Sequence, residues 1–169
     1  MQRKGLALAL VALLAGGGAL LAQPDAVTAG EYKRPKKLAV PADAPELWQS
    51  ECGSCHMAYP PGLLPPKAWE QHMSTLGQHY GSDASLDPAE EQQIRDFLLR
   101  ASGNNRLPVE GADVAGEPPK ITATRWFKRK HHEVSAKKFA RESVGGPGNC
   151  VACHRNAERG SFHKTKIPR

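Results

Sequence analysis

The 169-residue chain is poor in the large side chains that usually build a hydrophobic core. Only 6% of its residues are aromatic, whereas it contains 16 glycines and 14 prolines. Small domains bury a low fraction of their surface, and many depend on disulfides, metals or cofactors for stability. The composition therefore predicts that something other than apolar side chains fills much of the interior.

After residue 22 the sequence also lacks any apolar run long enough to span a bilayer. Before it, a short basic head precedes an apolar run at 6–22, the layout of a secretory signal peptide. We expect residues 1–29 to be removed after Ala29, with Ala22 as the alternative site, and the protein to be periplasmic. A retained leader would be a membrane anchor, because its 17 residues approach the ~17–25 that span a bilayer.

Charge of one sign is unevenly distributed along the chain. Residues 30–102 contain seven Lys/Arg and ten Asp/Glu, whereas residues 103–169 contain fourteen Lys/Arg and six Asp/Glu. Such an asymmetry indicates two modules that face different partners. Export argues against nucleic acid as the partner of the basic half and favours an acidic protein surface or an anionic membrane.

The sequence has only four cysteines, and all lie in two copies of a Cys-x-x-Cys-His motif. Disulfides in an exported protein and a zinc site are the two alternatives that four cysteines allow. The histidine directly after each pair favours haem c, in which two thioethers and one iron ligand come from a single turn of chain. We therefore predict two covalently bound haems, held by Cys52, Cys55 and His56 and by Cys150, Cys153 and His154.

Helical patterns frame the first motif. Helices are expected at 45–52, at 66–76 with Trp69 and Met73 on one face, and after Asp87, where an N-cap precedes Pro88. The Pro-rich stretch 59–66 is expected to be a loop without regular structure. In the second half, the sequence predicts one short helix after Ser135.

The order of helices and haem motif over residues 44–102 resembles a class I cytochrome c domain, in which the terminal helices cross and cover the haem. We therefore expect a mainly α fold with a class I cytochrome c-like haem domain at 30–103. A small, irregular second haem domain should follow at 104–169. Its apolar residues are too few to form a core, so its haem is expected to serve as the core.

The sixth ligand of each iron decides what the protein can do. His/Met ligation raises the reduction potential, and an open position permits ligand chemistry. Met57 follows His56 directly and cannot reach the opposite face of the first haem. In a class I domain the distal ligand comes from the loop before the closing helix, and His79 lies there. We expect His79 to be the ligand, with Met73 and His72 as alternatives.

Three histidines could reach the second iron. His163 follows its motif by nine residues, whereas the adjacent His131 and His132 precede the motif by about twenty. Trp126 and Phe127, just before this pair, would naturally cover a haem face. We favour His131, followed by His132 and then His163.

Three stretches together resemble the dihaem cytochrome c family, abbreviated DHC. They are residues 76–87 around His79, Trp126 with residues 131–134, and residues 149–160 around the second motif. The resemblance spans essentially the whole mature chain in the same order. It implies two bis-histidine haems of low potential, with His56 paired to His79 and His154 paired to His131. The adjacent His132 departs from the family pattern and leaves the register of that last pair open.

The family resemblance implies electron transfer, with electrons passing to a small oxygen-binding c-type haem protein and a membrane cytochrome b as a further redox partner. No small-molecule substrate and no nucleic acid is expected. The alternative is a haem enzyme, such as a peroxidase or a sulfur- or nitrogen-oxide reductase, with one open iron. The two functions differ in whether every iron has a protein side chain as its sixth ligand.

Overall fold

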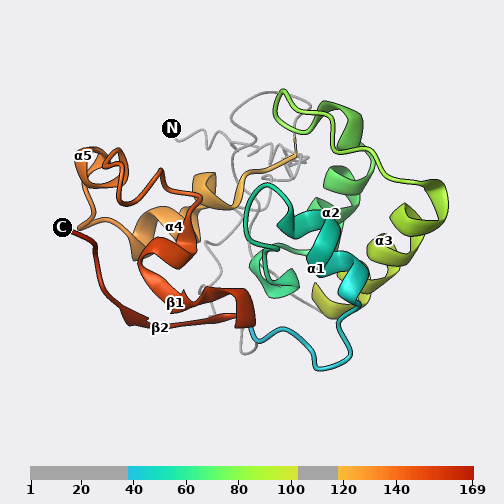
Figure 1. The fold of residues 1–169 in the computed structure, drawn as a ribbon, viewed down its shortest axis with the longest axis horizontal. Helices are drawn as coiled ribbons and strands as arrows, with labels where there is room; N and C mark the ends of the chain where they lie inside the picture. Colours follow the sequence, from blue (N-terminus) through green and yellow to red (C-terminus); the bar gives the residue numbers. More distant parts are fainter. Residues whose placement is uncertain (1–37, 103–117) are drawn as a thin grey trace, which may run out of the picture. The chain divides into compact units, whose positions relative to one another are not determined.

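The computed structural model describes residues 38–102 and 118–169 (Figure 1). These residues belong to one compact unit, Lys33–Arg169. The predicted signal peptide, 1–29, lies outside the described residues, and so does the predicted domain boundary between residues 103 and 104. No helix in the described ranges has the length and apolarity needed to cross a membrane.

The described residues are mainly helical and contain one small sheet (Figure 1). The elements, in chain order, are α1 (Glu46–Gly53), α2 (Pro66–Met73), α3 (Pro88–Ser102), α4 (Arg125–Lys130), α5 (Ala136–Phe139), β1 (His154–Asn156) and β2 (Ser161–Thr165). Short 3₁₀ turns lie at Pro61–Leu63, Leu76–Gln78, Ile121–Ala123, Cys150–Ala152 and Ala157–Arg159. The mainly helical class agrees with the sequence-based prediction.

The predicted helices of the first half are present with small changes at their ends. At the start of α3, the Asp87 carboxylate accepts a hydrogen bond of 3.0 Å from the Ala89 N–H, as expected of an N-cap. Helix α2 ends at Met73 instead of residue 76. The hydroxyls of Ser74 and Thr75 donate back to carbonyls four residues earlier, at 2.8 and 2.9 Å. Such side-chain bonds compete with continuation of the helix and explain its early end.

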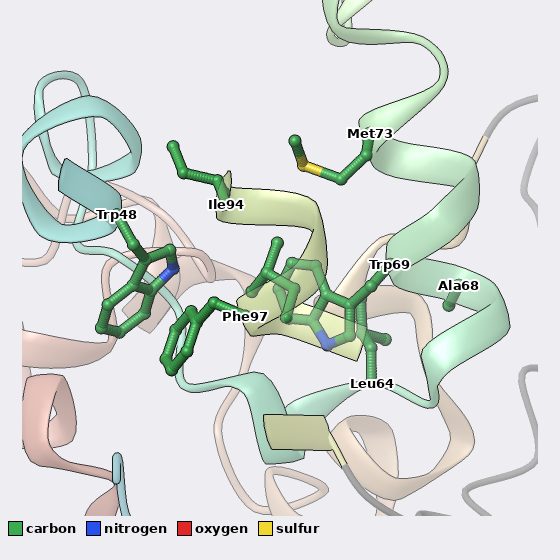
Figure 2. Packing of buried hydrophobic residues seen from close by; sticks show 8 residues of the cluster. Trp48, Leu64, Ala68, Trp69, Met73, Ile94 and Phe97 are labelled. Carbon is green, nitrogen blue, oxygen red and sulfur yellow. The ribbon is translucent and has the colours of Figure 1, made fainter. Parts of the chain in front are cut away.

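One hydrophobic core joins α1, α2 and α3 (Figure 2). Trp48 from α1 packs against Phe97 from α3, with ring centres 5.1 Å apart. Met73 and Trp69 come from one face of α2, as predicted, and both side chains are buried in this core with Ile94 of α3. Figure 2 shows the Met73 side chain extending towards Ile94. The core therefore accounts for Met73 as a packing residue.

The expectation that residues 59–66 lack regular structure is wrong. Pro61–Leu63 form a 3₁₀ turn whose residues are buried. The Trp69 indole N–H donates a hydrogen bond of 2.7 Å to the Pro61 carbonyl and holds the turn against α2. Proline presets the backbone angle that a helical first turn needs, so its abundance here favours a turn over an open loop.

The second half contains more regular structure than predicted. The expected helix after Ser135 is α5, and the Ser135 hydroxyl caps it. Helix α4 was not predicted, although Thr124 is a good N-cap and its hydroxyl accepts from the Phe127 N–H at 3.2 Å. Strands β1 and β2 were not predicted either, because segments of three and five residues are too short to show an alternating pattern.

The hairpin of β1 and β2 carries a glycine that packs against the beginning of the described chain. Gly160 has φ +74°, and a Cβ atom there would lie 1.7 Å from the Leu38 carbonyl oxygen. One residue earlier, the Arg159 carbonyl accepts a 3.4 Å hydrogen bond from the Val40 N–H. Only glycine permits both this backbone angle and this close approach.

We expect Gly160→Ala to destabilise the protein more than Gly145→Ala does. Gly145 has nearly the same φ, +72°, but a Cβ there would meet its nearest neighbour, Asn149 Nδ2, at an ordinary 3.5 Å. Gly145→Ala should therefore cost only the left-handed strain of about 1–2 kcal/mol. Guanidinium unfolding of the haem-loaded protein measures both. Equal losses would show that the contact with Leu38 has no energetic role.

Candidate functional site

The first cysteine motif lies at the end of α1 and in the turn that follows it. Cys52 is partly buried against the core of the three helices, whereas Cys55 is exposed. The Nδ1 atom of His56 lies 2.8 Å from the Met57 carbonyl oxygen. A carbonyl can only accept, so the imidazole donates through Nδ1, and Nε2 is left with its lone pair for a metal.

The ring of His79 lies near that of His56, with ring centres 6.2 Å apart and ring planes inclined by 34°. Two iron–nitrogen bonds of about 2 Å, plus half an imidazole ring at each end, add up to about 6 Å. Burial, and then the nearby His56, lower the pKa of His79. The imidazole is therefore neutral at physiological pH, the form that ligates iron.

The loop that carries His79 is held by residues just after the undescribed segment. Tyr80 adopts φ +52°, a left-handed conformation that is rare for a side chain of its size. Its hydroxyl donates a 2.8 Å hydrogen bond to the Pro118 carbonyl, and the Lys120 ammonium lies 4.6 Å from its ring centre. These contacts hold the position of His79 from the second half of the chain.

The alternatives to His79 are placed differently. His72 is only 8% exposed, and burial lowers its pKa to about 4. Its Nε2 lies 3.3 Å from the Pro119 carbonyl oxygen, so this nitrogen carries the proton and donates. Met73 is part of the hydrophobic core, with 4% exposure. The structure thus brings His79, and neither alternative, to the position facing His56 with a free nitrogen.

The second motif borders a cavity that is partly open to solvent. Both cysteines of the motif and His154 line it, together with His131 from the end of α4. The remaining wall is mostly apolar or aromatic and includes Trp126, Phe127, Val134, Phe139, Val144 and Phe162. A large, flat, apolar cofactor matches such a wall better than a hydrated ion does.

His131 and His154 oppose each other across this cavity. Their ring centres are 6.1 Å apart and their planes are perpendicular, at 89°. His131 donates from Nδ1 to the Phe127 carbonyl at 2.9 Å and stacks on the Phe127 ring. The Nδ1 atom of His154 lies 3.4 Å from the Thr165 hydroxyl, and burial is the main cause that lowers the pKa of His154. Because the Phe127 carbonyl can only accept, His131 carries its proton on Nδ1 and its Nε2 keeps the lone pair that a metal would bind.

His132 and His163 do not line the cavity. The Nδ1 atom of His132 bonds to the Arg129 carbonyl at 2.9 Å, and its side chain is 73% exposed. His163 is also exposed. The structure therefore separates the adjacent histidines that the sequence left open, since His131 alone of the three lies opposite His154.

The disulfide and zinc alternatives lack support. No disulfide joins any two of the four cysteines. Across residues 38–102 and 118–169, no group of three or more His, Cys, Asp or Glu side chains is placed to hold a bare metal ion.

Sequence reasoning missed Tyr59, which lies between the two sites. Its ring stacks on His56, with ring centres 4.8 Å apart, and its hydroxyl donates a 2.8 Å hydrogen bond to the Gly148 carbonyl. In the same loop, Leu63 lines the cavity of the second site. An aromatic residue three positions after a haem motif was the available signal, but its partner in the second half could not be read from the sequence.

Comparisons with known proteins identify a family for this chain. The chain matches the family model for dihaem cytochrome c over residues 48–162. A diheme cytochrome c from Rhodobacter sphaeroides is 41% identical and has a TM-score of 0.60, and the match covers 73% of this chain and 99% of that one. A diheme cytochrome c from Shewanella baltica OS155 is 35% identical, with a TM-score of 0.62 and coverage of 74% and 95%. A search of curated proteins finds no match.

The residues at both sites fit the cofactor that these relatives imply. Each site pairs a motif histidine with a second imidazole at the spacing that one iron requires, and both cysteines of the second motif line its cavity. More than half of the chain matches the family model, and two solved relatives are covered almost completely. The chain belongs to the dihaem cytochrome c family and carries two covalently bound c-type haems.

Proposed function

We propose that the protein is an electron carrier whose two haem irons are both six-coordinate. The first haem is attached to Cys52 and Cys55 and ligated by His56 and His79. The second is attached to Cys150 and Cys153 and ligated by His154 and His131. One observation carries this proposal: each motif histidine faces a second imidazole with ring centres 6.1–6.2 Å apart.

The bound haems would supply the one-electron exchange between ferric and ferrous iron. The chain controls the protonation state and the orientation of the imidazoles that would ligate each iron. Burial keeps His79 and His154 neutral, so each offers a lone pair over the physiological pH range. Two imidazoles on one iron favour a low potential relative to His/Met ligation. Hydrogen bonds from Nδ1 fix the orientation of His56 and His131.

The arrangement around the first haem supports the class I cytochrome c-like part of the proposal. In such a domain, the first and last helices pack against each other beside the haem. Here α1 ends in the first motif, and its Trp48 packs on Phe97 of α3. His79 comes from the loop before α3, where a class I domain supplies its distal ligand.

The geometry weighs against a peroxidase or an oxide reductase. Those enzymes need an iron position that substrate can enter, usually with an acid or base beside it. At both sites the space opposite the motif histidine holds an imidazole from a structured segment. The Tyr80 hydroxyl anchors the His79 loop, and the Phe127 carbonyl anchors the His131 ring. Both proposed ligands therefore lie in segments fixed by hydrogen bonds.

We propose that the protein works in the periplasm, where the N-terminal leader would deliver it, and that it exchanges electrons with protein partners. A membrane cytochrome b on the donor side and a small oxygen-binding c-type haem protein on the acceptor side fit this role. The basic second half supports an acidic partner surface, since complementary charge speeds encounter between redox proteins.

Near the second haem, three exposed cations surround a hollow beside the haem motif. Cys153 and the half-exposed apolar Ile167 line the hollow, together with Arg155, Lys166 and Arg169. Apolar contact at the centre with cations at the rim is the usual anatomy of a transient protein interface. We call this surface the basic hollow and propose that an acidic redox partner docks there.

The ligand assignment is tested by carbon monoxide. The dithionite-reduced wild type should show low-spin bands that carbon monoxide does not change. His79→Ala and His131→Ala should each leave one haem high-spin and able to bind carbon monoxide, because each removes one sixth ligand. His132→Ala and His163→Ala are the matched controls and should stay low-spin. If reduced wild type binds carbon monoxide at one iron, the enzyme alternative replaces electron transfer.

The two haems should give different electron paramagnetic resonance signals in the ferric state. Perpendicular imidazoles leave two iron d orbitals nearly equal in energy and produce a strongly anisotropic low-spin signal, whereas more nearly parallel rings produce a rhombic one. The 89° pair at the second haem and the 34° pair at the first should therefore differ. His131→Ala should remove the more anisotropic signal. Two identical low-spin signals would contradict these ring orientations.

The basic hollow is tested with a small anionic oxidant. Ferricyanide should oxidise the reduced wild type faster at low salt than at high salt, since screening weakens attraction to exposed cations. Lys166→Glu should slow this oxidation at low salt. Lys67→Glu makes the same charge change at an exposed position on α2 and should have the smaller effect. Equal slowing in both variants would mean that net charge, and not the hollow, governs the encounter.

A further inference from the structure

The His79 ring belongs to a cluster of three rings in the first half of the chain. Its centre lies 6.0 Å from that of His72 and 5.0 Å from that of Tyr80. The centres of the His72 and Tyr80 rings are 5.9 Å apart. All three spacings fall in the range of direct ring contacts. The position of the proposed distal ligand therefore depends on the two rings that pack beside it.

The two rings beside the distal ligand are bonded to consecutive carbonyls of the second half. The Tyr80 hydroxyl donates to the Pro118 carbonyl at 2.8 Å, and His72 Nε2 lies 3.3 Å from the Pro119 carbonyl oxygen. The next residue, Lys120, places its ammonium 4.6 Å from the centre of the Tyr80 ring. Three residues in a row thus hold the side chains that pack on the distal ligand.

The backbone of Tyr80 gives this anchoring its importance. Tyr80 follows His79 directly and has φ +52°, a left-handed conformation that residues with a large side chain rarely adopt. A strained angle of this kind persists only where surrounding contacts hold it. The hydrogen bond to Pro118 is such a contact, so its loss would let the backbone beside the ligand relax.

The segment that starts at residue 118 continues to the distal ligand of the second haem. The 3₁₀ turn Ile121–Ala123 and helix α4 meet at Thr124, which ends the turn and caps the helix. The Thr124 N–H donates back into the turn at 3.2 Å, and the Lys128 N–H donates to the Thr124 carbonyl at 3.0 Å. His131 lies at the end of α4, where its N–H donates to the Phe127 carbonyl at 3.0 Å. Local hydrogen bonds therefore stiffen the whole path from the turn to His131.

Ile121 brings the same turn into contact with the second haem site. Its side chain lines the cavity there and also packs against the hydrophobic core of the first half. Its carbonyl accepts a 2.7 Å hydrogen bond from the hydroxyl of Thr124, which is only 3% exposed. The wall of the second site therefore begins one residue after Lys120, the residue that contacts Tyr80 at the first site.

We propose that residues 118–131 couple the ligation of the two irons, an inference that rests on the proposed function. Tyr80 and His72 are positioning residues, which hold His79 through hydrogen bonds to one end of this segment. The other end of the segment carries His131. Displacement of one distal imidazole therefore weakens the hold on the other. Because coupling between two binding sites is reciprocal in free energy, the effect acts in both directions.

The test is an equilibrium titration of the ferric, haem-loaded protein with cyanide. Cyanide binds ferric iron by displacing the distal imidazole, so its apparent affinity rises when that imidazole is held less firmly. The shifted haem methyl resonances report on the two haems separately. His79→Ala and His131→Ala, each with one open iron, assign these resonances to the first and the second haem.

Two variants loosen the segment, one at each end. Tyr80→Phe removes the hydroxyl that bonds to Pro118, and Thr124→Val replaces the hydroxyl that caps α4 with a methyl group. Tyr80→Phe should raise the cyanide affinity several-fold at the first haem and also raise it at the second. Thr124→Val should raise it several-fold at the second haem and also raise it at the first. His72→Phe keeps a buried ring but loses the bond to Pro119, and it should repeat the result of Tyr80→Phe.

Ile94→Val is the matched control for a general loss of stability. Ile94 is buried in the core of α1, α2 and α3 and lies outside the 118–131 segment. The shorter side chain lowers the stability of the fold, but both cyanide affinities should stay at their wild-type values. If Ile94→Val raises both affinities as much as Tyr80→Phe does, the proposal is wrong. It is also wrong if either Tyr80→Phe or Thr124→Val acts at one haem alone.

The outcome is separable from that of the proposed function. Binding of carbon monoxide to the reduced wild type would show an open iron and refute the carrier role, whatever the cyanide affinities are. Conversely, two closed irons in the wild type, with effects confined to one haem in each variant, would leave the carrier role intact. That result would refute only the coupling through residues 118–131.

Discussion

With the ligation proposed above, the structure depends on one distance, the span that a single iron imposes between two opposed imidazoles. Both histidine pairs satisfy it, at 6.2 and 6.1 Å between ring centres. In each pair one ring belongs to a cysteine motif, and the other comes from a separate segment that must be held still. The chain does this with backbone carbonyls: Pro118 holds the His79 loop through Tyr80, and Phe127 orients His131. A hydrophobic core with few aromatic residues is sufficient here, because the core only has to hold the imidazole rings in place.

The two haem sites are not independent structural units. The turn after the first motif contributes Tyr59 to one side of the first site and Leu63 to the wall of the second. Trp69 fixes this turn through its bond to Pro61. A stretch that looks like a proline-rich spacer in the sequence therefore contributes side chains to both haem sites.

Structural features that are determined by residues close together in the sequence could be predicted. The haem motifs follow from fixed spacing, and α3 from its Asp87 cap. The pairing of His79 with His56 followed from a family pattern. Features that depend on distant partners were not. Tyr59 has no recognisable role until Gly148 is beside it, and the hairpin is too short to show a period. His131 and His132 are adjacent and identical in type, so the sequence alone cannot separate them. In the structure, only His131, at the end of α4, lines the cavity.

The contact of Gly160 with Leu38 has a consequence for biogenesis. The first described residues rest on a hairpin made from almost the last ones, with Val40 bonded to Arg159. The segment with Leu38 and Val40 cannot reach its final position until the hairpin of β1 and β2 has formed beside the second haem site. The fold therefore closes last at this contact, which joins the two ends of the described chain.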